Sequence, residues 1–242
     1  MEFTIQDPTP KIPLMVYFIV TALLLACVFG PSYWVKYAMW RNSKTIADMP
    51  GTGGELAEHL LQRFGLEGFI LEETLPGQDH FDFAAKAVRF SPKNYSGKSI
   101  TAIAVATHEV GHALQFFKHE KIFQLHQKYI PTVLRFKKIG IVLISIAPLI
   151  ALVLKIPVLI LGCVLLSLFF QLLGTFMYFI VLPEEWDASF GKALPILIDG
   201  EYLSEQHERP IKRVLKAAAL TYVAGALADI LNIGRWLLLL RR

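Results

Sequence analysis

The chain has 242 residues, of which 54% are hydrophobic and only 18% are charged. This composition is unusual for a soluble domain, whose surface must meet water, and it favours membrane-spanning segments. The 24 Lys and Arg residues exceed the 20 Asp and Glu residues by too little to indicate a nucleic-acid-binding protein. Both cysteines, Cys27 and Cys163, lie in apolar segments, which excludes a disulfide framework.

Several apolar segments are candidates for crossing a membrane. Residues 12–30 are predicted to form a first, retained transmembrane helix, because about 20 apolar residues span the hydrocarbon core. Residues 139–183 are predicted to form a transmembrane hairpin of two helices, with a tight turn at Lys155. The last apolar segment, 214–240, holds Asp229 and Arg235, so it is predicted to be either transmembrane or interfacial.

Residues 31–138 form the polar part between the first span and the hairpin. Thr52 and Glu55 have the spacing of a capping box and predict the start of a helix. Short strands are predicted over 68–75 and over 86–90, on either side of turn-forming residues. A helix, short strands and a further helix are the order expected of a small zincin-like catalytic domain.

The further helix, predicted over about 99–118, carries the sequence His108-Glu109-Val110-Gly111-His112. Residues four apart lie on one face of a helix, so both imidazoles can reach one cation. Zinc favours histidine nitrogens and, in catalytic sites, keeps one position for water. The pattern therefore predicts a zinc site with His108 and His112 as ligands and Glu109 as the general base for zinc-bound water.

A third ligand is expected from Glu184 or Glu185, which directly follow the hairpin and open a polar segment, 184–213. Acidic residues are also favoured at a helix start by the helix dipole, and the pattern does not choose between the two. The segment lies on the same side of the membrane as residues 31–138, because the hairpin crosses and returns. Lys and Arg near the span ends concentrate on that side, which predicts a cytoplasmic active site.

Three blocks of this sequence resemble the YugP-like bacterial membrane zinc metallopeptidases: residues 108–112, residues 182–189 and residues 217–224. Two further blocks, 79–82 and 88–92, extend the resemblance. It implies a gluzincin-like zinc endopeptidase of the bacterial inner membrane, distantly similar to the HtpX and CAAX prenyl endopeptidases. It also implies Glu185 as the third zinc ligand.

The sequence departs from the wider group at Ser189, where that group usually has an acidic residue four positions after the ligand glutamate. Asp187 is the nearest acid, but on a regular helix it would point roughly to the opposite face. His80 and Tyr222 are weaker candidates, for lining the substrate cleft and for donating a hydrogen bond to an oxyanion. A substrate strand is predicted to add to the edge of the strand over 86–90.

The sequence thus predicts a mainly α membrane protein with three or four transmembrane helices and a small α+β zincin-like cytoplasmic domain. The predicted activity is zinc-dependent hydrolysis of membrane or membrane-proximal proteins. One alternative is an intramembrane protease of the site-2 type, whose Asp-Gly sequence is imitated by Asp199-Gly200. The other is a non-catalytic membrane scaffold. The expected partners are the protein substrate and the lipid bilayer, with a homo-oligomer or a regulatory membrane partner left open.

Overall fold

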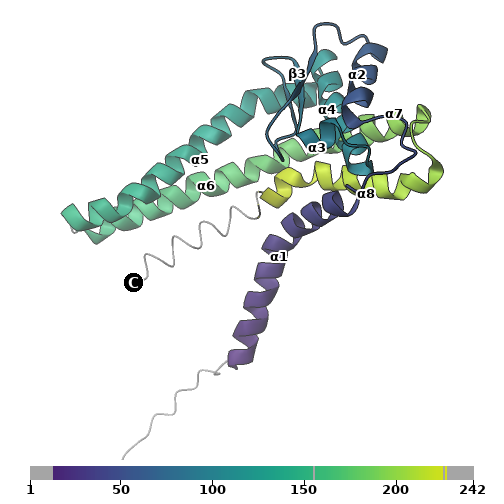
Figure 1. The fold of residues 1–242 in the computed structure, drawn as a ribbon. Coiled ribbons are helices and arrows are strands. Elements are labelled where there is room, and N and C mark those ends of the chain that lie inside the picture. The colour runs from purple at the N-terminus through teal and green to yellow at the C-terminus, as the bar shows by residue number, and fades with distance from the viewer. Residues whose placement is uncertain (1–12, 155, 226, 228–242) are drawn as a thin grey trace, which may run out of the picture.

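The computed structural model describes residues 13–154, 156–225 and 227. Helices dominate, and a small three-stranded sheet covers one side of them (Figure 1). In chain order the elements are α1 (Leu14–Arg41), α2 (Gly53–Arg63), β1 (Ile70–Glu73), β2 (His80–Asp82), β3 (Ala87–Phe90), α3 (Pro92–Tyr95), α4 (Ile100–Phe117), α5 (Lys121–Leu154), α6 (Pro157–Trp186), the π-helix η1 (Asp187–Ala193), α7 (Leu194–Asp199), the 3-10 helix η2 (Glu205–His207) and α8 (Glu208–Ala219).

Helix α4 is the central element, and residues 100–115 along it are all buried. It packs against α2, the sheet, η1 and α8. Its start is fixed by Ser99, whose side chain accepts a hydrogen bond from the Ala102 amide. The predicted capping box at the start of α2 is also confirmed: Thr52 and Glu55 each accept a hydrogen bond from the other's backbone amide.

Strand β3 occupies the middle of the sheet. It pairs in parallel with β1, with Leu71 opposite Val88, and antiparallel with β2, with Phe81 opposite Val88. Both edges of β3 are therefore already hydrogen-bonded, and the prediction that a substrate strand adds to residues 86–90 is wrong. The free edges belong to β1 and to β2, a three-residue strand that the sequence pattern had not revealed.

Helices α5 and α6 lie side by side and extend away from the rest of the domain (Figure 1). The pair extends beyond both ends of the hairpin predicted over 139–183, because α5 already begins at Lys121 and α6 continues to Trp186. The prediction placed the ends where charge returns, but charged residues do not end a helix. Pro183 lies inside α6 and does not start a new helix, so Glu184 and Glu185 are on the last turn of α6.

Helix α1 leaves the domain in a different direction from the α5–α6 pair (Figure 1). Among the described residues, α1 and the helix containing α6 are long and apolar enough to cross a membrane. Large apolar side chains along the first half of α1, such as Leu14, Phe18 and Leu24, are exposed. The expected count of three or four spans stays a prediction.

The segment predicted as a last helix over 214–240 divides into two parts. Helix α8 begins earlier, at Glu208, and ends at Ala219. Val214 and Leu215 are fully buried in the domain core. Residues 214–219 thus belong to the folded domain, because apolar residues on one face of α8 pack against α4 and α1. Residues 226 and 228–240 lie outside the described part of the chain.

Gly111 lets α4 approach η1 closely. A Cβ atom at this position would lie 2.8 Å from the backbone oxygen of Ala188, closer than atoms normally pack. A backbone carbonyl cannot rotate away as a side chain can, so the helices themselves would have to move.

We therefore expect Gly111→Ala to destabilise the protein by about 1–3 kcal/mol through overpacking, against the small gain in helix propensity that alanine gives. Thermal unfolding of the detergent-solubilised protein measures this. Gly162→Ala is the matched control, because Gly162 is also helical but a Cβ atom added there would meet no other atom within 4 Å. Equal melting temperatures for the two variants would contradict the proposed close approach.

Candidate metal centre and active site

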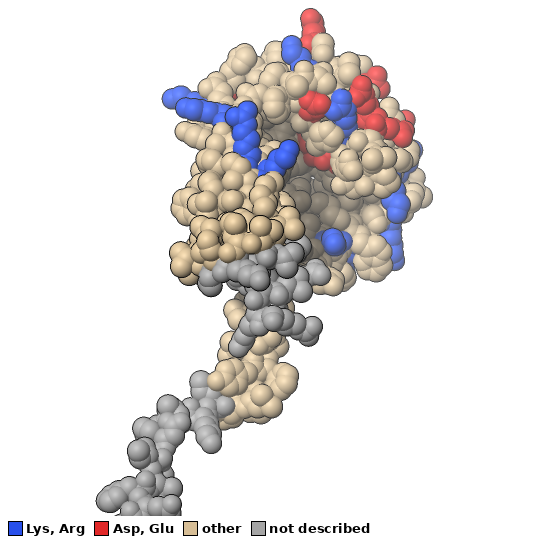
Figure 2. Space-filling model, turned by 90° about the vertical axis from the view of Figure 1, so that its left-hand side faces the viewer, with Lys and Arg blue, Asp and Glu red and all other residues tan. Residues whose placement is uncertain are grey.

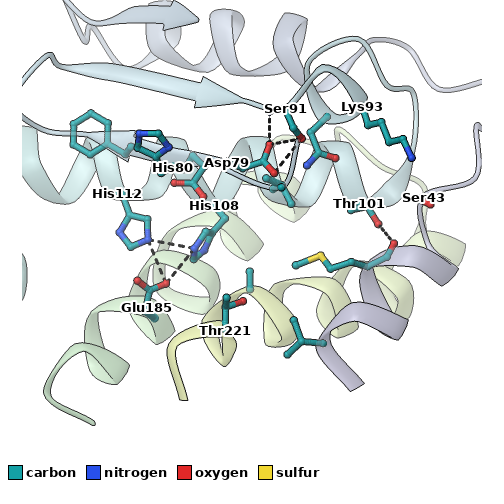
Figure 3. Close-up of a pocket in the computed structure, with 18 of the residues that line it drawn as sticks. Ser43, Asp79, His80, Ser91, Lys93, Thr101, His108, His112, Glu185 and Thr221 are labelled. Atoms are coloured by element: carbon teal, nitrogen blue, oxygen red, sulfur yellow. Dashed lines mark hydrogen bonds and ion pairs between the residues drawn. The ribbon is translucent and has the colours of Figure 1, made fainter. Parts of the chain in front are cut away.

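Three side chains converge at the centre of the domain (Figure 3). His108 and His112 lie one turn apart on α4, with their Nε2 atoms 3.2 Å apart. Oε2 of Glu185, from the end of α6, lies 3.3 Å from Nε2 of His108 and 3.4 Å from Nε2 of His112. All three residues are buried. Two imidazoles and one carboxylate thus face a single point.

The geometry of these three atoms suits a zinc ion. Ligand atoms held at about 2.0–2.1 Å around a tetrahedral zinc are separated by about 3.3–3.4 Å, close to the 3.2, 3.3 and 3.4 Å between the three atoms here. Two histidines and one glutamate are also the donor set of catalytic zinc sites with an open fourth position. His108, His112 and Glu185 therefore form a group that could hold a metal ion.

Charge around His112 also favours a cation. Burial is the largest single influence on His112 and lowers its pKa. The carboxylates of Glu185, Glu109 and Glu184 together outweigh burial and raise the pKa of His112 to about 10. The carboxylates around His112 therefore favour a positive charge at this position, which a bound metal ion can supply.

Ser189 orients His108. Its hydroxyl donates a hydrogen bond to the backbone oxygen of Leu215 at 3.0 Å and lies 3.0 Å from Nδ1 of His108. The hydroxyl hydrogen is used on Leu215, so the Ser189 oxygen accepts from Nδ1 of His108. The lone pair of His108 is then on Nε2, the atom that faces Glu185. Ser189 stands where the wider group usually has an acidic residue, and here its hydroxyl contacts His108.

Gln115 orients His112 in the same way. Its Oε1 lies 3.0 Å from Nδ1 of His112, and its Nε2 donates to Oδ2 of Asp187 at 2.8 Å and to the backbone oxygen of Glu184 at 3.1 Å. Asp187 therefore reaches the site through Gln115, although it was predicted to point away. Gln115 was not predicted, although it lies on the same face of α4, three residues after His112.

The two adjacent glutamates have different partners. Oε2 of Glu184 lies 2.7 Å from Nδ1 of His126 on α5, whereas Glu185 faces His108 and His112. Oε1 of Glu184 is buried without a hydrogen-bond partner, 3.6 Å from Nδ1 of His112. The structure thus distinguishes two residues that the sequence pattern left equivalent, and it places His126 beside Glu184.

Glu109 is buried next to His108 and lines the same pocket as the three converging residues. Burial raises the pKa of its carboxyl group, because the charged form loses hydration. The two histidines oppose this shift, whereas Glu185 and Asp79 add to it. A carboxyl group whose pKa is moved towards neutrality is suited to accepting and returning a proton.

The converging residues open into a pocket of about 1350 Å³, lined by α1, the segment around β2 and β3, α4, and the chain after α8. His80 and Tyr222, the two weaker candidates, both line it. His80 is held by a 2.7 Å contact between its Nδ1 and the backbone oxygen of Gln78. Figure 2 shows one face of the molecule hollowed, with both basic and acidic side chains around the hollow.

Comparisons with known proteins cover almost the whole chain. The family model described as "Putative neutral zinc metallopeptidase" matches residues 16–241. The protein described as "Putative membrane protease YugP" from Bacillus subtilis (strain 168) is 35% identical over 229 residues, which is 89% of this chain and 94% of that protein. No solved structure matches the chain. The family model and this relative show that the chain belongs to the neutral zinc metallopeptidase family.

Proposed function

We propose that the protein is a membrane-anchored zinc endopeptidase that hydrolyses membrane or membrane-proximal proteins. The observation that carries this proposal is the convergence of His108, His112 and Glu185 beside Glu109 in one pocket. Family membership supports zinc and peptidase chemistry, and the Bacillus relative is described as a membrane protease.

In the proposed reaction, His108, His112 and Glu185 hold the zinc ion. When bound, zinc supplies Lewis acidity, which lowers the pKa of water and polarises the scissile carbonyl. The Glu109 carboxylate accepts a proton from the attacking water and passes it to the nitrogen of the leaving amine. Hydrogen bonds from Nδ1 of each histidine, to Ser189 and Gln115, keep both Nε2 lone pairs available.

The membrane arrangement is also part of the proposal. Helix α1 and the α5–α6 hairpin anchor the protein as a multi-pass protein of the bacterial inner membrane, and the catalytic domain faces the cytoplasm. Support comes from the length and apolar composition of α1 and the helix containing α6 and from the lysines and arginines that follow or precede the apolar segments.

The site-2-type alternative has less support. It requires an aspartate from an Asp-Gly sequence at the metal, but Asp199 lies at the end of α7 and is not among the described residues that line the pocket. The carboxylate next to the two histidines comes from Glu185 instead.

The ligand set is tested by a matched pair of substitutions at adjacent residues. We expect Glu185→Gln to lose most of its bound zinc, since it removes a charged ligand, and Glu184→Gln to keep it. The measurement is metal content by mass spectrometry of the purified full-length protein, with His112→Ala as a second variant expected to lose zinc. Zinc retained in Glu185→Gln but lost in Glu184→Gln would reverse the assignment.

The role of Glu109 is tested by activity. We expect Glu109→Ala to keep zinc but to lower the rate of β-casein cleavage by about 10²–10⁴-fold, the usual contribution of a general base. Glu58→Ala on the exposed face of α2 is the control and should cleave as the wild type does. Equal cleavage by wild type and Glu109→Ala would show that this carboxylate is not the base.

The topology is tested by labelling cysteines in intact cells. In a protein without Cys27 and Cys163, a cysteine replacing exposed Glu58 should react with a membrane-impermeant maleimide only after permeabilisation. A cysteine replacing Ile156, at the turn between α5 and α6, should react from outside. The opposite pattern would place the catalytic domain outside the cell.

A further inference from the structure

The pocket wall carries side chains of both charges. The carboxylates of Asp79, Glu109, Glu184 and Glu185 line it, and so do three lysines, Lys36, Lys93 and Lys98. Figure 3 shows Lys93 extending beside Ser43 at the end away from Glu185. The lysines come from α1 and from the segment between β3 and α4, so two separate parts of the chain place positive charge on this pocket.

These lysines are not neutralised by the part of the chain that the structure describes. Within residues 13–154, 156–225 and 227, none of the three forms an ion pair with a carboxylate. Lys192, by contrast, contacts both Glu120 and Asp187. Lys98 is half-buried, so its charge is less screened by water than a fully exposed ammonium would be.

The distance between the two ends can be estimated from α4, one face of which lines the pocket. Ser99, Thr101, Val105, His108 and His112 all contribute to this wall. From Ser99 to the middle of the two histidines the helix advances about 16 Å, at roughly 1.5 Å per residue. An extended peptide covers that distance with about five residues, at roughly 3.3 Å each.

We propose that Lys36, Lys93 and Lys98 bind a carboxylate of the peptide substrate, about five residues from the bond that is cleaved. The proposal rests on the endopeptidase function proposed above and adds a preference for acidic substrates. The carboxylate belongs to an acidic side chain or to the C-terminus of the substrate. A peptide is favoured as the ligand because the lysines share one pocket with the metal-binding residues, so a chain that occupies one end extends towards the other.

Peptide hydroxamates provide a test with a fixed register, because the hydroxamate anchors each probe at the zinc ion. One series extends N-terminally from the hydroxamate and the other C-terminally. Each series contains a pair of peptides that differ only in Asp or Asn at the fifth residue. The second series also contains a pair with alanine as the fifth and last residue, ending in a free carboxylate or in a carboxamide. Binding to the zinc-loaded, full-length protein in detergent is measured by calorimetry.

In one series we expect the probe with the carboxylate to bind about two- to fivefold more tightly than its neutral partner, as exposed ion pairs allow. The difference should disappear in the Lys93→Gln/Lys98→Gln protein and at high salt. It should persist in Lys118→Gln, which removes an exposed lysine outside the pocket. The Asp pair and the C-terminal pair show which source of carboxylate is bound.

Equal binding of charged and neutral probes in both series would overturn the proposal, and so would a difference that the double lysine variant leaves unchanged. A double variant that loses only its association with phosphatidylglycerol vesicles would assign the lysines to the lipid surface instead, and would also overturn it. Failure of every hydroxamate to bind would contradict the zinc site itself. Hydroxamate binding without discrimination would contradict only the lysine site.

Discussion

The close packing of α4 against the end of α6 and η1 is the constraint on which the site depends. Gly111 has no side chain, so the Ala188 carbonyl can approach the middle of α4. At this separation Glu185 reaches both histidines, and Ser189 reaches Nδ1 of His108. A metal site needs its ligand atoms within a few tenths of an ångström of their places, and here those places are set by contact between two backbones.

The features that the sequence predicted correctly are local ones. His108 and His112 are four residues apart, and helical geometry alone brings them to the same face. Thr52, Glu55 and Ser99 begin helices through hydrogen bonds to backbone atoms only three residues away. Such patterns need no knowledge of the rest of the chain, which is why the helix ends near these residues could be predicted.

The features that the sequence did not predict depend on distant contacts. The central place of β3 follows from its pairing on both sides, and no residue of β3 encodes which neighbours it will have. Glu184 and Glu185 are chemically alike, and only the packing of α5 and α4 gives one to His126 and the other to His108 and His112. Asp187 approaches Gln115 where the chain changes from α-helix to π-helix, an irregularity often found at functional sites.

Helix α6 runs without interruption from the turn at Pro157 to the carboxylate of Glu185. A helix of 30 residues behaves as a nearly rigid rod about 45 Å long. If this rod crosses the bilayer as proposed, a change in lipid thickness that alters its tilt would shift the carboxylate relative to α4. Metal affinity would then depend on the thickness of the surrounding lipid bilayer. The lipid composition of the membrane would in this way affect peptidase activity.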